Sequence, residues 1–113
     1  MGYLSEYNDI DSLQKRAHQT SKAKGWWDGE RSIPEQIALM HSELSEALEA
    51  FRIGDEYHIE PNGKPEGIYV ELADCVIRIM DTLEANGQSL YTLLLQKMNY
   101  NDTRPHRHGG KKA

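Results

Sequence analysis

Four carboxylates fall into two pairs with the same spacing, Glu43-x-x-Glu46 and Glu71-x-x-Asp74. Residues three apart project from one face of a helix, so each pair presents two carboxylates together. Two adjacent antiparallel helices would bring all four close, where like charges repel strongly. A divalent cation relieves this repulsion, and ligands made only of carboxylate oxygen favour Mg²⁺ or Mn²⁺ over zinc. The spacing therefore predicts a magnesium site formed by Glu43, Glu46, Glu71 and Asp74.

A solvated helix face is the main alternative for these acids. Acid pairs at this spacing are common on such faces, where Asp74 would simply pair with Arg78 one turn later. A ferritin-like di-iron site requires Glu-x-x-His, and neither pair supplies the histidine. Residues 55–66 have acidic ends at EF-hand spacing, but Tyr57 and Glu60 stand where that loop needs an oxygen ligand and a glycine. Magnesium binding and a solvated acidic face are the two hypotheses that remain.

The C-terminal part of the chain turns from apolar to basic along one helical stripe. Leu94 belongs to the apolar part, and Lys97, Asn101 and Arg104 continue the same face. Further on, Lys111 follows two glycines, whose backbone N–H groups can approach a phosphate closely. Arginine and lysine supply the charge-assisted bonds that a triphosphate needs. These residues are candidate phosphate ligands, and the alternative is a frayed, solvated tail.

Two adjacent tryptophans, Trp26 and Trp27, precede the first acidic pair. Neighbouring indoles on a loop seldom both become buried. One of them could anchor the core while the other stacks on a nucleobase, although packing roles for both are equally consistent with the sequence.

The elements that must position these residues are helices. Ser32 with Glu35 three residues later is a capping box, and Pro34 suits a first helical turn. Residues 55–67 are polar and rich in proline and glycine, which indicates a loop, and no stretch shows the alternation of a strand. The fold class expected is all-α, in one domain spanning residues 1–113. Helices are expected at about residues 9–24, 33–53, 68–85 and 90–103.

The composition of the chain limits which partners and which cellular compartment are expected. A net charge of −5 argues against a nucleic-acid polymer as ligand, and no apolar stretch is long enough to cross a bilayer. The single cysteine, Cys75, cannot form an internal disulfide, which suits a reducing cytosol. The first residues lack the basic and apolar regions of a secretory signal. A cytoplasmic protein is therefore expected.

Several segments in order resemble the MazG-like nucleotide pyrophosphohydrolases of the all-α NTP pyrophosphatase superfamily. The resemblance runs from about residue 26 to residue 111. It implies a four-helix-bundle-type fold completed by oligomerisation, with the acidic quartet holding Mg²⁺ and the basic stripe contacting phosphate or sugar. Relatives that hydrolyse dCTP carry an aromatic residue where this chain has Arg78, so no base preference is implied. The segments that carry the resemblance are Ile33–Gln36, Glu43–Glu49, Glu71–Ile79 and Lys97–Lys111.

The function that follows from the resemblance is Mg²⁺-dependent hydrolysis of an NTP or dNTP to the monophosphate and pyrophosphate, in nucleotide-pool house-cleaning. Glu46, and after it Glu43, is the candidate to position the attacking water or accept its proton. Phosphoribosyl-ATP pyrophosphohydrolase is the alternative within the superfamily. A non-enzymatic helical module that binds a partner through apolar faces is the alternative from another class.

Residues 68–85 also predict an oligomer. Apolar side chains surround most of this helix, and only the stripe of Glu71, Asp74, Arg78 and Asp81 is polar. Four short helices from one chain cover too little of such a helix. A homodimer or homotetramer is therefore expected.

Overall fold

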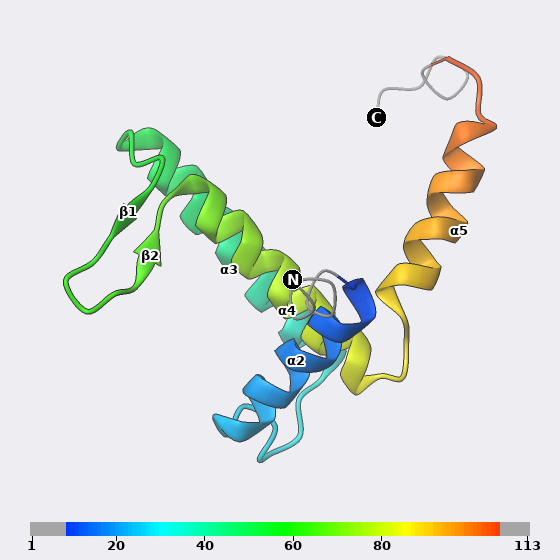
Figure 1. The fold of residues 1–113 in the computed structure, drawn as a ribbon, viewed down its shortest axis with the longest axis horizontal. Coiled ribbons are helices and arrows are strands. Elements are labelled where there is room, and N and C mark those ends of the chain that lie inside the picture. The colour runs from blue at the N-terminus through cyan, green and yellow to red at the C-terminus, as the bar shows by residue number, and fades with distance from the viewer. Residues whose placement is uncertain (1–8, 107–113) are drawn as a thin grey trace, which may run out of the picture.

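The computed structural model describes residues 9–106, and four helices account for most of that range (Figure 1). Helices α3 and α4 lie side by side and antiparallel, and α2 packs across α4. The all-α expectation is confirmed, and so are the four helix starts, each to within one residue. The helices are α2 (Ile10–Ala23), α3 (Ile33–Arg52), α4 (Ile68–Ala85) and α5 (Leu90–Asp102).

The helix ends follow from local chemistry that the sequence shows. The Ser32 hydroxyl accepts a hydrogen bond from the Glu35 backbone N–H, which caps α3 as the capping box predicts. Ser89 caps α5 in the same way. After α3 the chain turns at Gly54, whose φ of 74° is easily adopted only without a side chain. The Ser32 cap sets the start of α3, the helix that carries the first acidic pair.

The connection between α3 and α4 contains a short hairpin that the sequence pattern does not predict. Strand β1 (His58–Ile59) pairs antiparallel with β2 (Pro65–Glu66). Two-residue strands are too short to show alternation, which is why the pattern of residues 55–67 indicates only a loop. Gly67, with φ of 125°, then passes against the Glu56 backbone, where a Cβ atom would collide. The hairpin thus directs the chain into α4 at a fixed point.

A buried amide connects α2 to the far end of α4. The Gln14 side chain donates to Glu84 Oε1 at 2.9 Å and to the Gln88 carbonyl at 2.7 Å, and it accepts from the Leu90 N–H at 2.9 Å. Gln14 is the most buried polar residue described. Its three hydrogen bonds place α2 against α4 and set the start of α5.

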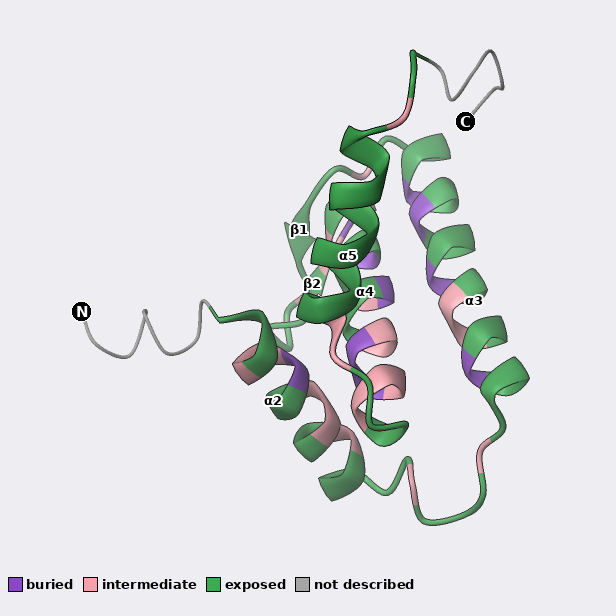
Figure 2. Cartoon of the chain, turned by 90° about the vertical axis from the view of Figure 1, so that its right-hand side faces the viewer, coloured by how far each residue is buried: buried purple, intermediate pink, exposed green. Residues whose placement is uncertain are grey.

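The core of the described chain is thin (Figure 2). Among residues 9–106 the buried apolar side chains are small or flexible, and no large side chain is fully covered. Many large apolar residues on α3, α4 and α5 are instead exposed, Phe51 to 69%. The buried apolar residues are Ala47, Ala50, Cys75 and Met80.

Helix α5 stands away from the other three (Figures 1 and 2). It contacts α2 near its start, has no buried residue, and exposes Leu94, Leu95 and Met98. The apolar first half of this helix therefore does not pack into a core among the described residues. Within residues 9–106 a three-helix unit forms instead of a closed four-helix bundle, and α5 projects from it. None of the described helices is long and apolar enough to cross a membrane.

Candidate functional site

Three carboxylates converge where α3 and α4 run side by side. Glu43 and Glu46 from α3 and Glu71 from α4 each offer an oxygen within 4.8 Å of the others. Glu43 and Glu71 are buried and Glu46 is exposed. The i, i+3 spacing and the antiparallel pairing therefore do bring carboxylates from both predicted pairs together. Such an oxygen set suits Mg²⁺ or Mn²⁺.

Asp74, the fourth predicted ligand, lines the same pocket but is not part of this group of three. Burial raises its pKa, and the nearby charges of Glu43 and Glu46 raise it further, while Arg78 opposes them. Asp74 therefore lies one turn further along α4, close enough to the cluster for the charges of Glu43 and Glu46 to raise its pKa. It does not pair with Arg78 in the way the solvated-face alternative requires.

Among the carboxylates of the cluster, Glu71 has the largest shift in pKa. Burial raises its pKa to about 8, and hydrogen bonds to the side chains of Glu46, Glu66 and Glu43 raise it in the same direction. Lys64 Nζ, 2.7 Å from Glu66 Oε1, lowers the pKa of Glu66. Without a divalent cation, Glu71 therefore retains a proton near neutral pH because a further negative charge is unfavourable there.

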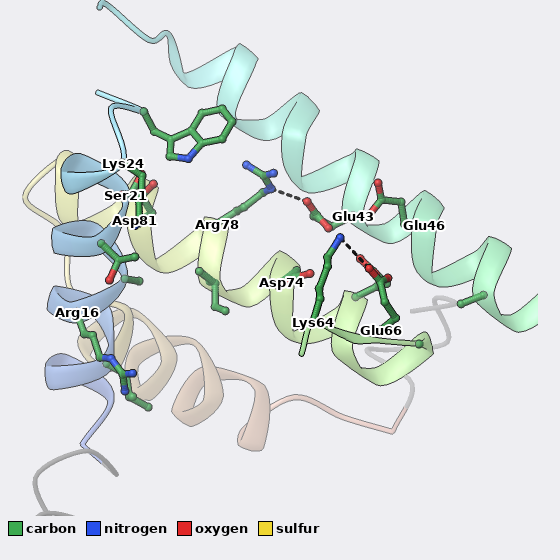
Figure 3. Close-up of a pocket in the computed structure, with 18 of the residues that line it drawn as sticks. Arg16, Ser21, Lys24, Glu43, Glu46, Lys64, Glu66, Asp74, Arg78 and Asp81 are labelled. Carbon is green, nitrogen blue, oxygen red and sulfur yellow. Dashed lines mark hydrogen bonds and ion pairs between the residues drawn. The ribbon is translucent and has the colours of Figure 1, made fainter. Parts of the chain in front are cut away.

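Arg78 is bound to the cluster itself. Its Nε donates to Glu43 Oε1 at 2.7 Å, linking α4 to α3 across the pocket (Figure 3). The Arg78 side chain is 32% exposed and that of Glu43 is 9% exposed. The guanidinium is thus accessible from the pocket while its partner carboxylate is covered.

The pocket beside the cluster has a volume of about 1020 Å³ and lies between α3, α4 and α2. Its α2 side supplies cations and hydroxyls opposite the carboxylates, as Figure 3 shows for Arg16, Ser21 and Lys24. One wall is therefore acidic and the other is basic and hydroxyl-bearing. A ligand that binds a metal ion at one end and carries further anionic or hydrogen-bonding groups at the other suits such a division.

The far end of the α4 polar stripe binds the tryptophan loop. Asp81 Oδ1 lies 2.7 Å from His18 Nδ1 and accepts from the Trp27 indole N–H at 3.0 Å. The His18 and Trp27 rings meet edge to face at 5.4 Å. Trp27 is therefore the tryptophan that anchors the loop. It is held by a hydrogen bond to the Asp81 carboxylate and not by burial in an apolar core.

Trp26, in contrast, is exposed and lines the pocket. The Arg31 guanidinium lies 5.9 Å from the Trp26 ring and 4.8 Å from the Trp27 ring. The loop thus presents one indole and one guanidinium to the pocket, both of which can stack on a planar ligand.

The basic stripe of α5 does not reach this pocket within the chain. Lys97 and Arg104 each lie over the ring of Tyr100, at 5.2 Å and 5.6 Å, and Asn101 is exposed between them. No residue of α5 lines the pocket. Lys111 and the glycines before it lie outside the described residues.

Several pocket residues are not predictable from the sequence. Arg16, Lys24 and Lys64 give no signal because single basic residues on a helix or hairpin are usually solvated. The sequence alone indicates an ordinary surface or packing histidine at His18, yet this side chain contacts Asp81. The one available signal is Asp81 itself, an acid on the polar stripe of a helix that is apolar on its other sides, since a buried acid needs a partner.

Comparison with known proteins adds no assignment: no family model, no curated protein and no solved structure matches this chain.

Proposed function

We propose that this chain is a Mg²⁺-dependent, MazG-like nucleoside triphosphate pyrophosphohydrolase, converting an NTP or dNTP to the monophosphate and pyrophosphate. The observation that carries the proposal is the convergence of Glu43, Glu46 and Glu71 from two helices within 4.8 Å. They line a pocket whose opposite wall is basic. The proposed role is nucleotide-pool house-cleaning in the cytoplasm, a compartment that suits the free Cys75.

The residues present fit Mg²⁺ by their donor chemistry. Three carboxylates supply hard oxygen ligands, and the raised pKa of Glu71 reflects a site where a further negative charge is unfavourable without a cation. Glu43, Glu46 and Glu71 would hold the ion, and Asp74, one turn along α4, would complete the set. A bound Mg²⁺ supplies charge neutralisation at phosphate oxygens and lowers the pKa of water.

The chain's own residues would then divide the remaining work. Glu46, the exposed member of the cluster, would orient a water molecule or accept its proton, because Glu43 and Glu71 are covered. Lys64 at the hairpin and Arg78 on α4 provide positive charge beside the carboxylates. Such charges stabilise the negative charge that develops on a leaving pyrophosphate.

The pocket has room for a whole nucleotide. Its volume of about 1020 Å³ is at the upper end of the roughly 300–1,000 Å³ typical of small-molecule sites. With the polyphosphate at the carboxylates, the base would extend toward the tryptophan loop. Trp26 is the better stacking candidate because it lines the pocket, whereas Trp27 is bound to Asp81.

We further propose that the fold is completed by a second copy, as a homodimer or a homotetramer of such dimers. An exposed apolar stripe runs along α3 through Ile37, Leu44, Leu48 and Phe51. At about 100° per residue it lies on the side of α3 opposite Glu46. Pairing these stripes would build a four-helix bundle from two chains and leave the carboxylate pocket open. Helix α5 could then bring Lys97, Asn101 and Arg104 to a neighbouring pocket.

A substrate panel tests the activity. The eight common NTPs and dNTPs are incubated with purified protein and Mg²⁺, and pyrophosphate and orthophosphate are measured separately. At least one substrate should give pyrophosphate and monophosphate in equal amounts, with activity lost in EDTA and in Glu43→Gln. Absence of pyrophosphate release across the panel would reject the proposal.

A further inference from the structure

Arg78 is a cation directly bound to a proposed metal ligand. It projects from the polar stripe of α4 toward α3, and its Nε donates to Glu43 Oε1 at 2.7 Å (Figure 3). The three carboxylates of the cluster lie within 4.8 Å of one another. Arg78 thus supplies positive charge at the position where a divalent cation would compete for the same carboxylate.

The geometry of this pair leaves most of the guanidinium unused. The single bond to Glu43 uses Nε, and among residues 9–106 neither terminal nitrogen donates a hydrogen bond to the protein. An arginine whose purpose is a structural ion pair gains most from a bidentate contact, with two parallel N–H bonds. Here two donor groups lie in the pocket lining, available to an anion bound there.

We infer that Arg78 is a placeholder cation, which neutralises Glu43 in the metal-free protein, yields that carboxylate to the divalent ion, and then binds the polyphosphate of the substrate. The inference rests on the proposed function, because it assumes that the cluster binds a metal and the pocket a triphosphate. Arg78 suits both states, since its planar fork of donors matches carboxylate and phosphate equally well.

Two opposite effects follow from this role. A positive charge held against Glu43 repels an incoming divalent cation, so removing it should tighten the binding of the metal alone. The same charge attracts a triphosphate, so removing it should weaken nucleotide binding. A residue that merely supports the fold would change both affinities in the same direction or change neither.

The test measures both affinities in Arg78→Gln and in Arg78→Lys, which keeps the charge but loses the fork. Mn²⁺ alone is titrated calorimetrically, and an α,β-methylene nucleoside triphosphate is then titrated with Mg²⁺ present. Arg78→Gln should bind Mn²⁺ about tenfold more tightly and the analogue at least about tenfold more weakly. Arg78→Lys should keep the wild-type Mn²⁺ affinity and bind the analogue with intermediate strength. Arg52→Gln, which breaks an exposed Arg–Glu pair on α3, is the matched control and should change neither affinity.

The outcomes separate this inference from the proposed function. Mn²⁺ binding to wild type with equal or weaker binding to Arg78→Gln would overturn the placeholder role and leave the metal site standing. Binding only after Arg78→Gln would support the role strongly. If neither protein binds Mn²⁺, the metal site and the inference both fall.

Discussion

At the scale of single residues, Glu71 is the group that we expect to respond most strongly to a divalent cation. It is buried, and it shares hydrogen bonds with three other glutamates. An ion that binds only the folded state stabilises it by about 2.7 kcal/mol at 100 times its Kd, or roughly 10 °C in a domain of this size. Saturating Mg²⁺ should therefore raise the Tm of wild type by several degrees and that of Glu71→Gln by very little. Glu30→Gln, in the exposed loop before α3, is the control and should respond like wild type. Equal shifts in wild type and Glu71→Gln would exclude the cluster as the metal site.

The raised pKa of Glu71 also predicts a pH dependence of stability without metal. Burial raises this pKa from 4.5 to about 8, so the folded chain holds a proton that the unfolded chain has released. The contribution of that proton to the free energy of unfolding is complete below about pH 4.5 and is lost as the pH rises toward about 8. In EDTA, the stability of wild type relative to Glu71→Gln should fall over this window. Denaturant unfolding of both proteins from about pH 5 to pH 8.5 measures it, and a constant difference would contradict the assigned environment of Glu71.

How far the residues could be predicted depended on the kind of signal each one gave. The paired spacing identified Glu43, Glu46 and Glu71 because helical periodicity alone determines which side chains share a face. The partner of Arg78 was not predictable, since an i, i+4 acid on its own helix competed with an acid on another helix. Lys64 and His18 became recognisable only through tertiary contacts that no local spacing encodes.

At the scale of elements, α5 is the helix whose proposed role requires a second copy of the chain. Its basic stripe lies away from the pocket of its own chain. If α5 serves a neighbouring pocket, Lys97→Ala combined with Arg104→Ala should reduce kcat/KM by at least about tenfold and leave Mn²⁺ binding unchanged. Wild-type kcat/KM in this double variant would mean that the stripe is only a solvated helix end.

A mixing experiment determines which chain α5 serves. Glu71→Gln, expected to be inactive, and the Lys97→Ala/Arg104→Ala variant, expected to be strongly impaired, are unfolded together and refolded. If α5 acts on the neighbouring chain, a hybrid dimer contains one intact pocket, and the mixture should regain about a quarter of wild-type activity. If α5 acts within its own chain, every pocket in the hybrid has a defect, and the activity of the mixture should not exceed that of the impaired parent variant.

The helix boundaries could be predicted because caps and glycines are local, as Ser32 and Gly54 illustrate. The placement of α5 could not be predicted from the sequence. Its leucines would fit an apolar face of the same chain or of a second copy equally well. Local sequence also gave no sign of the hairpin at residues 58–66, whose strands are shorter than any periodic signal.

At the scale of the whole molecule, the thin core predicts association. The buried apolar residues among those described are few, while the α3 stripe of Ile37, Leu44, Leu48 and Phe51 is exposed. Sedimentation equilibrium at micromolar concentration should therefore give a dimer or tetramer. Leu48→Lys should shift it toward monomer, because a charge would be buried in the interface. Ala38→Lys, exposed on α3 outside this stripe, should leave the assembly intact. A stable, active wild-type monomer would contradict the proposed interface.

The most direct test of the central claim is to determine which phosphorus atom water attacks. Wild type is incubated with Mg²⁺ and its best nucleoside triphosphate in H₂¹⁸O, and the products are resolved by mass spectrometry, with Glu71→Gln as the inactive control. A pyrophosphohydrolase acting at the carboxylate cluster should place one ¹⁸O in the monophosphate and none in an intact pyrophosphate, and Glu71→Gln should form neither product. Orthophosphate as the first product, or label in the pyrophosphate, would contradict attack at the α-phosphorus.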